Sequence, residues 1–151
     1  MPKYGPSIKK ILSICQTLTT DDVCQLGVSI LEALEALHSK GLVYNNLSET
    51  HVLVGDHCFM NKDEVRLIDF SRAREFINDK GEIIKNDGVI YNPSKVGGGG
   101  LNLYDPMNDV RDLLAFLKNL SEVKDTDKID KMSKLIRDME KPEFHKLKDI
   151  L

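Results

Sequence analysis

The sequence lacks an uninterrupted apolar stretch long enough to span a bilayer, and residues 1–6 contain no apolar run like that of a signal peptide. It also lacks a strong excess of either charge. The net charge is -3 and the pI is about 5.8, which gives no electrostatic reason to expect nucleic acid or a membrane as a partner. The cysteines Cys15, Cys24 and Cys58 are odd in number and lack metal-ligand spacing, which indicates free thiols in a reducing compartment. These absences predict an intracellular protein, cytoplasmic or nuclear.

The composition that is present is that of an ordinary globular protein. Of the 151 residues, 41% are hydrophobic and 30% are charged, values that are not typical of a disordered chain. A chain of this length can bury a sizeable core without disulfides or structural metals. We therefore predict a single domain over residues 1–151.

The strongest local pattern predicts a helix over residues 21–39. Thr19 and Thr20 carry hydroxyls that suit an N-cap, and the two aspartates that follow are favourable in a first turn. Gly41, just after the pattern ends, readily adopts the left-handed conformation that stops a helix. The apolar residues that recur at helical spacing are Val23, Leu26, Ile30, Leu31, Leu34 and Leu37.

The remaining segments differ in length and period. Residues 52–54 and 65–68 are β-rich runs separated by turn-forming residues, which favours a small antiparallel pair. Residues 71–107 sustain no period and contain a run of four glycines, so we expect a long loop there. Helical spacing returns at Asn108 and continues in two further segments, the last with Pro142 in its first turn. The predicted fold class is mainly α, with a small antiparallel β element and a long loop.

Three segments, in this order, resemble motifs of a protein kinase. Residues 44–54 (Tyr-Asn-Asn-Leu-Ser-Glu-Thr-His-Val-Leu-Val) are similar to the catalytic loop H-R-D-L-x-x-x-N and the strand after it, with Leu47 at the apolar position. Residues 68–71 (Ile-Asp-Phe-Ser) are similar to the strand end and D-F-G motif that hold magnesium. Residues 108–110 (Asn-Asp-Val) resemble the start of the buried helix whose aspartate anchors the catalytic loop.

The two ends of the chain extend this resemblance. Residues 1–12 are similar to the hinge of the casein kinase I and vaccinia-related kinase group, in which an aromatic-glycine pair precedes a short helix, and residues 141–147 are similar to that group's final helix. The chain therefore resembles the C-terminal lobe of a protein kinase, closest in character to this group. The resemblance implies a protein-kinase-like C-lobe in which residues 1–18 form the hinge and a short helix, residues 71–107 form an activation-segment-like loop, and the N-lobe is lacking.

The positions that would carry kinase chemistry are altered. The position of the catalytic carboxylate holds Asn46, an amide that cannot act as a base, and the lysine position holds Ser48. The position of the second metal ligand holds His51, a poor ligand for the hard magnesium ion, so that only Asp69 survives. The resemblance thus implies a degenerate, pseudokinase-like site with no catalytic residue, no metal and no cofactor, and hence a protein that is not an enzyme.

Asp109 occupies a position with a fold-supporting role. The resemblance implies that its carboxylate anchors the loop by accepting hydrogen bonds from the backbone N–H groups around Tyr44 and Asn45. Leu47 and Phe70 are expected to fill the core beneath the loop. A kinase lobe can keep its packing while losing its catalysis, because the two depend on different residues.

Some of these residues have a second interpretation. Asp69 is a weak candidate for binding a cofactor through a metal ion, but without an asparagine partner we favour a turn or capping carboxylate. His51, with His57 and Cys58, could be imagined as a soft-metal site. Their spacing fits no standard zinc pattern, so surface or packing roles are favoured.

Two functions remain as alternatives. The first is a non-catalytic protein-interaction or structural module, such as a scaffold, whose protein partner covers the hinge side near Ile8, Ile11 and Leu12, where apolar residues are expected to be exposed. The second is a residual or split protein kinase, an ATP-dependent phosphotransferase completed by an N-lobe from another chain. A third interpretation is a fragment of a longer pseudokinase. Neither nucleic acid nor membrane is expected as a partner.

Overall fold

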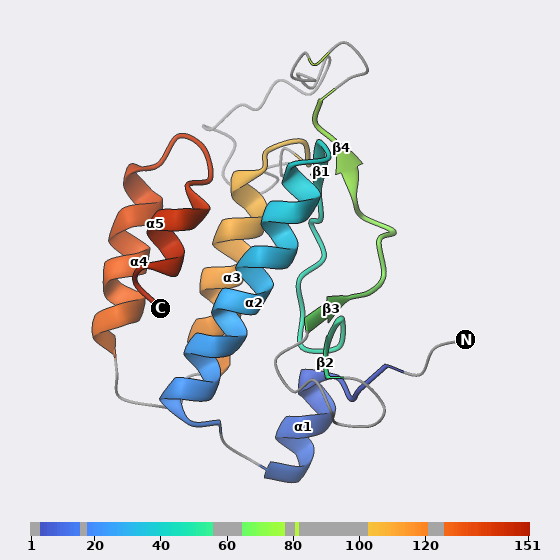
Figure 1. Ribbon diagram of the computed structural model, residues 1–151, viewed down its shortest axis with the longest axis vertical. Coiled ribbons are helices and arrows are strands. Elements are labelled where there is room, and N and C mark those ends of the chain that lie inside the picture. Colours follow the sequence, from blue (N-terminus) through green and yellow to red (C-terminus); the bar gives the residue numbers. More distant parts are fainter. Residues whose placement is uncertain (1–3, 16–17, 56–64, 78–80, 82–102, 121–125) are drawn as a thin grey trace, which may run out of the picture.

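Two long helices form the centre of the molecule. The computed structural model describes residues 4–15, 18–55, 65–77, 81, 103–120 and 126–151. Helix α2 (Thr20–His38) and helix α3 (Met107–Leu120) lie side by side, as Figure 1 shows. Helices α4 (Thr126–Asp138) and α5 (Phe144–Lys148) cover one side of this pair, and α1 (Ile8–Cys15) lies on the other side with the short strands.

Helix α2 has the start that its sequence predicts. The Thr19 hydroxyl accepts a hydrogen bond from the Asp22 N–H at 3.2 Å, and the Thr19 N–H donates to Asp22 Oδ2 at 3.1 Å, which together form a capping box. Gly41 follows the helix with φ of +74°, a conformation that favours glycine. The helix predicted over residues 21–39 is thus confirmed, with each end one residue earlier. The buried residues of α2 are Val23, Leu26, Gly27, Ile30, Leu31 and Leu34.

The C-terminal helices complete the hydrophobic core. Leu147 of α5 is fully buried in contact with the core cluster, and burial of a leucine side chain contributes about 1.5–3 kcal/mol. An ion pair at 2.6 Å between Lys148 Nζ and Glu35 Oε2 also joins α5 to α2. Pro142 lies before the N-cap residue Glu143, so the prediction that it belongs to the first helical turn is wrong. The helix begins only at Phe144, whose buried ring enters the core.

Within the described residues, four short strands form two separate antiparallel pairs. Strand β2 (Val52–Val54) pairs with β3 (Val65–Leu67), so the predicted β element is confirmed, although its second strand ends one residue early. Strand β1 (Leu42–Val43) pairs with β4 (Arg74–Glu75). The resulting fold is mainly helical with small antiparallel sheets, as the sequence predicts.

The segment 71–107, for which the sequence predicts a long loop, contains the short strand β4. Residues 74 and 75 form β4, because Gly41 and the strand after it present backbone groups to this segment, and the Phe76 N–H also donates to Gly41 O at 2.8 Å. Residues 78–80 and 82–102, including the glycine run 97–100, lie outside the described residues. The activation-segment-like character of this loop therefore stays a prediction.

Burial corrects two expectations about apolar side chains. Ile8 is only 2% exposed, so the expectation that it is exposed is wrong, whereas Ile11 and Leu12 are partly buried against the core and Ile14 of the same helix is 69% exposed. The reason is that the N-terminal segment docks on β2, where Val54 N–H donates to Pro6 O at 3.0 Å. Phe70, which was expected in the core, is 47% exposed.

Within the described ranges, no helix is both long enough and apolar enough to cross a bilayer.

Candidate functional site

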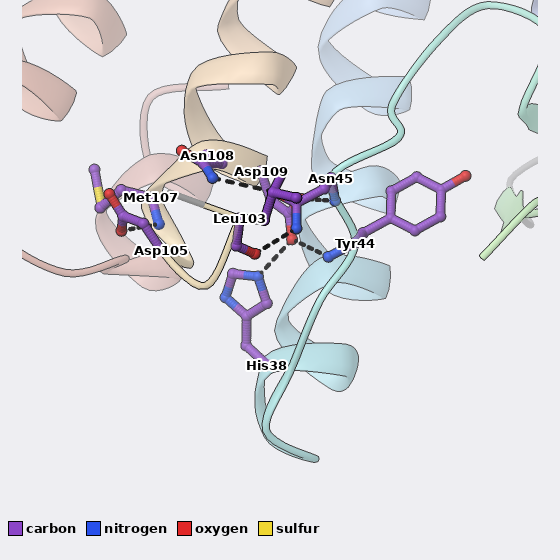
Figure 2. Close-up of polar contacts among 8 residues, drawn as sticks. All are labelled: His38, Tyr44, Asn45, Leu103, Asp105, Met107, Asn108 and Asp109. Carbon is purple, nitrogen blue, oxygen red and sulfur yellow. Dashed lines mark hydrogen bonds and ion pairs between the residues drawn. The ribbon is translucent and has the colours of Figure 1, made fainter. Parts of the chain in front are cut away.

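The carboxylate of Asp109, at the start of α3, is fully buried and joins three parts of the chain. Its Oδ2 accepts hydrogen bonds from the Tyr44 N–H at 2.7 Å and from His38 Nε2 at 2.8 Å, and its Oδ1 accepts one from the Asn45 N–H at 2.7 Å (Figure 2). The two backbone contacts are those expected from the sequence. Because hydrogen bonds to a charged group are about twice as strong as neutral ones, this carboxylate holds the loop after β1 firmly against α3.

His38 is the third partner of Asp109 and was not expected from the sequence. It is the last residue of α2, and its ring lies edge-on against Phe144 and Phe76, with centroid distances of 5.2 and 5.9 Å. A carboxylate only accepts hydrogen bonds, so His38 Nε2 carries the hydrogen. No spacing rule relates residue 38 to residue 109, since the contact depends on how α2 and α3 pack.

Asn45 bends the loop and secures its far side. Its φ of +56° lies in the left-handed region, which asparagine tolerates better than most residues. The side-chain Nδ2 donates to Leu103 O at 2.7 Å, and Oδ1 accepts from Asn108 Nδ2 at 3.1 Å (Figure 2). The sequence reasoning missed this role, because an asparagine in a loop has no distinctive spacing.

Tyr44 connects the loop with the segment that follows β3. Its side chain is fully buried, its hydroxyl donates to Ile68 O, and its ring meets the Phe70 ring edge-on at 5.2 Å. Burial raises the pKa of the Tyr44 hydroxyl well above its usual range, and the negative charges of Asp69 and Asp109 raise it further. The hydroxyl therefore stays protonated and serves as a hydrogen-bond donor.

Asp69 is held in a strained turn next to this loop. Its φ is +59°, and its carbonyl oxygen accepts a hydrogen bond from Asn46 Nδ2 at 2.8 Å. Its Oδ1 accepts a hydrogen bond from the Ser71 N–H at 3.2 Å. The Ser71 hydroxyl and N–H lower the pKa of the Asp69 carboxyl, with smaller contributions from Asn46 and His51. The carboxylate thus stays ionised in a turn that its own side chain supports.

His51 faces both the loop and this turn. Its Nδ1 lies 2.8 Å from Asn46 O, and its Nε2 lies 3.5 Å from Asp69 Oδ2. Ser48 is not part of this group, because its hydroxyl pairs with the Thr50 hydroxyl at 2.9 Å. The structure thus brings together three of the four residues that the sequence singled out around the site, namely Asn46, His51 and Asp69.

A cavity of about 360 Å³ lies beside the loop, and Asp112 of α3 is one of its walls. Partial burial raises the pKa of the Asp112 carboxyl, the nearby charge of Asp109 raises it further, and Arg72 opposes the change. In the part of the chain that the structure describes, no group of three or more His, Cys, Asp and Glu side chains is arranged to hold a metal ion. The cavity is lined by Lys9, Leu47, Ser48, Glu49, Thr50, Asp112, Ala115, Phe116 and Asn119.

Comparisons with known proteins point to protein kinases over about half of the chain. Casein kinase I homolog 2 of Saccharomyces cerevisiae is 27% identical over 77 residues, which are 50% of this chain and 14% of that protein. Serine/threonine-protein kinase AfsK of Streptomyces griseus is 33% identical over 76 residues, 50% of this chain and 9% of that protein. Mitogen-activated protein kinase 14 of Xenopus laevis is 33% identical over 70 residues, 46% of this chain and 18% of that protein.

These similarities support a kinase-like relationship, casein kinase I included. The matched part of the chain spans less than a fifth of the length of these curated relatives. No protein-family model matches the sequence.

Proposed function

We propose that this chain is a non-catalytic, pseudokinase-type module that acts by binding protein. Asn46 is the observation that carries the proposal. Phosphoryl transfer by a kinase needs a carboxylate at this position to accept the proton of the substrate hydroxyl, and an amide cannot do so. The Asn46 side chain instead donates a hydrogen bond to the backbone carbonyl of Asp69, which is a structural contact.

The metal chemistry of a kinase does not fit these residues either. Magnesium prefers oxygen ligands in near-octahedral geometry, whereas the position of the loop ligand holds the His51 imidazole. Its Nδ1 faces Asn46 O, and its Nε2 faces the Asp69 carboxylate. The position of the catalytic cation holds Ser48, whose hydroxyl pairs with Thr50. These residues therefore do not supply the magnesium site and the cation that phosphoryl transfer by a kinase needs.

The frame around the site supports a binding role. Asp109 and the asparagine amides hold the loop in place with hydrogen bonds of 2.7–3.1 Å that require neither metal nor nucleotide. A loop that is fixed in this way has a constant shape without a bound ligand. This is what a module needs if its function is to present a constant surface to a partner.

Exposed apolar side chains supply a candidate surface for a protein partner. Tyr4 is 44% exposed and Phe70 is 47% exposed, and aromatic side chains are enriched where proteins bind one another. Figure 1 places the N-terminal segment and the β3–β4 connection on the half of the molecule opposite α4 and α5. We expect the partner to be a protein domain that covers this half.

Calorimetric titration with Mg-ATP tests the non-catalytic part of the proposal. We expect no heat of binding for the chain alone, because one metal ligand and the cation near the phosphates are both replaced, by His51 and Ser48. Micromolar binding that requires magnesium and is lost in Asp69→Ala would contradict the proposal. Asp130→Ala, which removes an exposed carboxylate of α4, is the control for a general effect of charge.

Binding measurements with a partner purified from the source cells test the interaction part. We expect Tyr4→Ala and Phe70→Ala each to weaken binding by about tenfold or more, as removal of a central interface residue does. Lys131→Ala, at an exposed position on α4, is expected to have no effect. Equal affinities for all variants would exclude the proposed surface.

A split kinase is a second candidate, and one observation favours it. The Asp69 side chain is 44% exposed, so its carboxylate is accessible to a ligand supplied with another chain. Phosphate transfer by the purified complex, abolished by Asp69→Asn in this chain, would support this candidate over the first. Transfer that is unchanged by Asp69→Asn would place the activity in the partner.

A further inference from the structure

The cavity beside the loop has a lining of two kinds. Leu47 of the loop and Phe116 of α3 supply apolar surface, whereas Lys9, Glu49 and Asp112 supply charged groups. The Lys9 N–H donates to Glu49 O at 2.9 Å, which fixes this part of the loop against α1. The volume of about 360 Å³ lies within the range of small-ligand sites. The cavity is therefore suited to a group that combines an apolar stem with a charged head.

The two carboxylates of the lining, those of Glu49 and Asp112, lack a partner of opposite charge. Within the described residues, neither carboxylate forms a hydrogen bond or an ion pair. Elsewhere, Glu35 and Glu143 each form an ion pair with a lysine. Arg72 acts on Asp112 only as a nearby charge, without an ion pair. The cavity thus offers two acceptor groups to a ligand that carries N–H donors.

Asp112 is the more deeply placed of these two groups. Partial burial raises the pKa of its carboxyl, and the charge of Asp109 raises it further. Removing a carboxylate from water without pairing it costs free energy, so its ionised form is unfavourable in the chain alone. A cation that enters the cavity supplies the missing partner. Part of the cost is then recovered when the ligand binds.

We propose that this cavity binds the guanidinium group of an arginine side chain from a protein partner. Arginine fits better than lysine, because its planar head has five N–H donors, enough for both carboxylates, and packs on aromatic surface such as Phe116. Its methylene stem suits the apolar surface of Leu47. The Lys9 ammonium opposes any cation and limits the affinity. The choice of a protein as the source of the arginine rests on the proposed function, whereas the guanidinium site does not.

Titration of the chain with two blocked tripeptides, followed by nuclear magnetic resonance, tests the proposal. One peptide is acetyl-Ala-Arg-Ala-amide, and the other has citrulline, a neutral analogue of similar shape, in place of arginine. The readout is the chemical shift of the backbone amides of Ala115 and Asn119, which also line the cavity. We expect a saturable change with a millimolar Kd for the arginine peptide and none for the citrulline peptide at the same concentration.

Variants of the lining assign the contacts. Asp112→Asn and Glu49→Gln are each expected to weaken binding of the arginine peptide by about tenfold or more, the effect of losing a charged hydrogen bond. Lys9→Gln removes the opposing cation and is expected to tighten binding by about threefold. Asp130→Asn, an exposed carboxylate on α4, is the control for net charge and is expected to bind as the wild type does. Dispersion of the amide spectrum establishes that each variant is folded.

Four results would overturn the proposal. They are the absence of a saturable response in the wild type, equal binding of the citrulline or a lysine peptide, and unchanged affinity in the folded variants Asp112→Asn and Glu49→Gln. The fourth is a tenfold preference for agmatine over the arginine peptide, which would indicate a free amine rather than a protein as the source. These probes involve neither Mg-ATP nor the exposed rings of Tyr4 and Phe70, so this proposal and the proposed function can fail separately.

Discussion

At the scale of single residues, Asp109 is the side chain on which the site geometry depends most. It is fully buried and receives three hydrogen bonds, two of them from backbone N–H groups. We expect Asp109→Ala to lower the free energy of unfolding by about 3–5 kcal/mol, since the N–H groups lose a charged partner in the protein interior. Asp109→Asn keeps one acceptor oxygen and is expected to cost less. Urea denaturation at neutral pH measures both.

The control for this prediction is Asp130→Asn, which changes an exposed carboxylate on α4. Surface substitutions of this kind are usually within about 0.5 kcal/mol of the wild type. If Asp109→Ala were as mild as Asp130→Asn, the loop would have other partners that suffice, and Asp109 would not be its anchor.

The ionised carboxylate of Asp112 lowers the free energy of unfolding, because it is partly buried and lies near the charge of Asp109. Partial burial and the charge of Asp109 raise the pKa of its carboxyl in the folded protein above the unfolded value of 3.8. The folded state therefore holds this proton more tightly than the unfolded state does. The resulting contribution to stability is fully present below pH 3.8 and is lost as the pH rises through the folded pKa.

Asp112→Asn is accordingly expected to raise the free energy of unfolding at pH 7, because a neutral amide avoids the cost of an ionised, partly buried carboxylate. The gain is expected to disappear as the pH falls below 3.8, where the wild-type carboxyl is protonated in both states. Urea denaturation of the variant and the wild type, at pH 7 and in this acidic range, measures the difference in their free energies of unfolding at each pH. A variant that is less stable than the wild type at pH 7 would indicate that attraction to Arg72 outweighs burial.

At the scale of elements, α2 begins at a capping box that can be tested directly. The Thr19 hydroxyl accepts from the Asp22 N–H, which would otherwise have no partner within the helix. Thr19→Ala is expected to destabilise the protein by about 1 kcal/mol, seen as a lower thermal midpoint. Thr19→Ser keeps the hydroxyl and is the matched control, with a midpoint close to that of the wild type. Equal losses in both variants would mean that the threonine methyl group, and not the cap, matters.

The β1–β4 pair shows why some elements escape prediction. Each strand has only two residues, and a period of two cannot be recognised in so short a run. The register, with Leu42 opposite Glu75, arises only when the segment after β3 returns to the end of α2. Pairing between segments more than thirty residues apart therefore needs the tertiary structure.

At the scale of the whole molecule, one hydrophobic cluster includes residues from α1 to α5, which predicts a single cooperative unfolding transition. Ile8, near the N-terminus, and Leu147, near the C-terminus, are both buried in this cluster. Ile8→Ala and Leu147→Ala are each expected to cost about 2–5 kcal/mol and to shift the same transition. Circular dichroism of the helices and hydrogen exchange of the strand amides are two independent measurements of this unfolding transition.

Ile14→Ala is the matched control, since Ile14 lies on the same helix as Ile8 but is 69% exposed. We expect it to leave the transition almost unchanged. Two separate transitions, one moved by Ile8→Ala and the other by Leu147→Ala, would mean that the two ends of the chain belong to different folding units.

The sequence by itself determined the features whose causes are local. Helix α2, its cap at Thr19 and the left-handed Gly41 follow from spacing and from the chemistry of neighbouring residues. The contacts of Asp109 with Tyr44 and Asn45 were expected only through the resemblance to a kinase.

The tertiary structure alone decided the features that depend on distant segments. It buried Ile8, left Phe70 half exposed, and brought His38 to Asp109 and His51 to Asp69. The physical reason is that these outcomes depend on distances between atoms far apart along the chain, which spacing along the sequence does not encode.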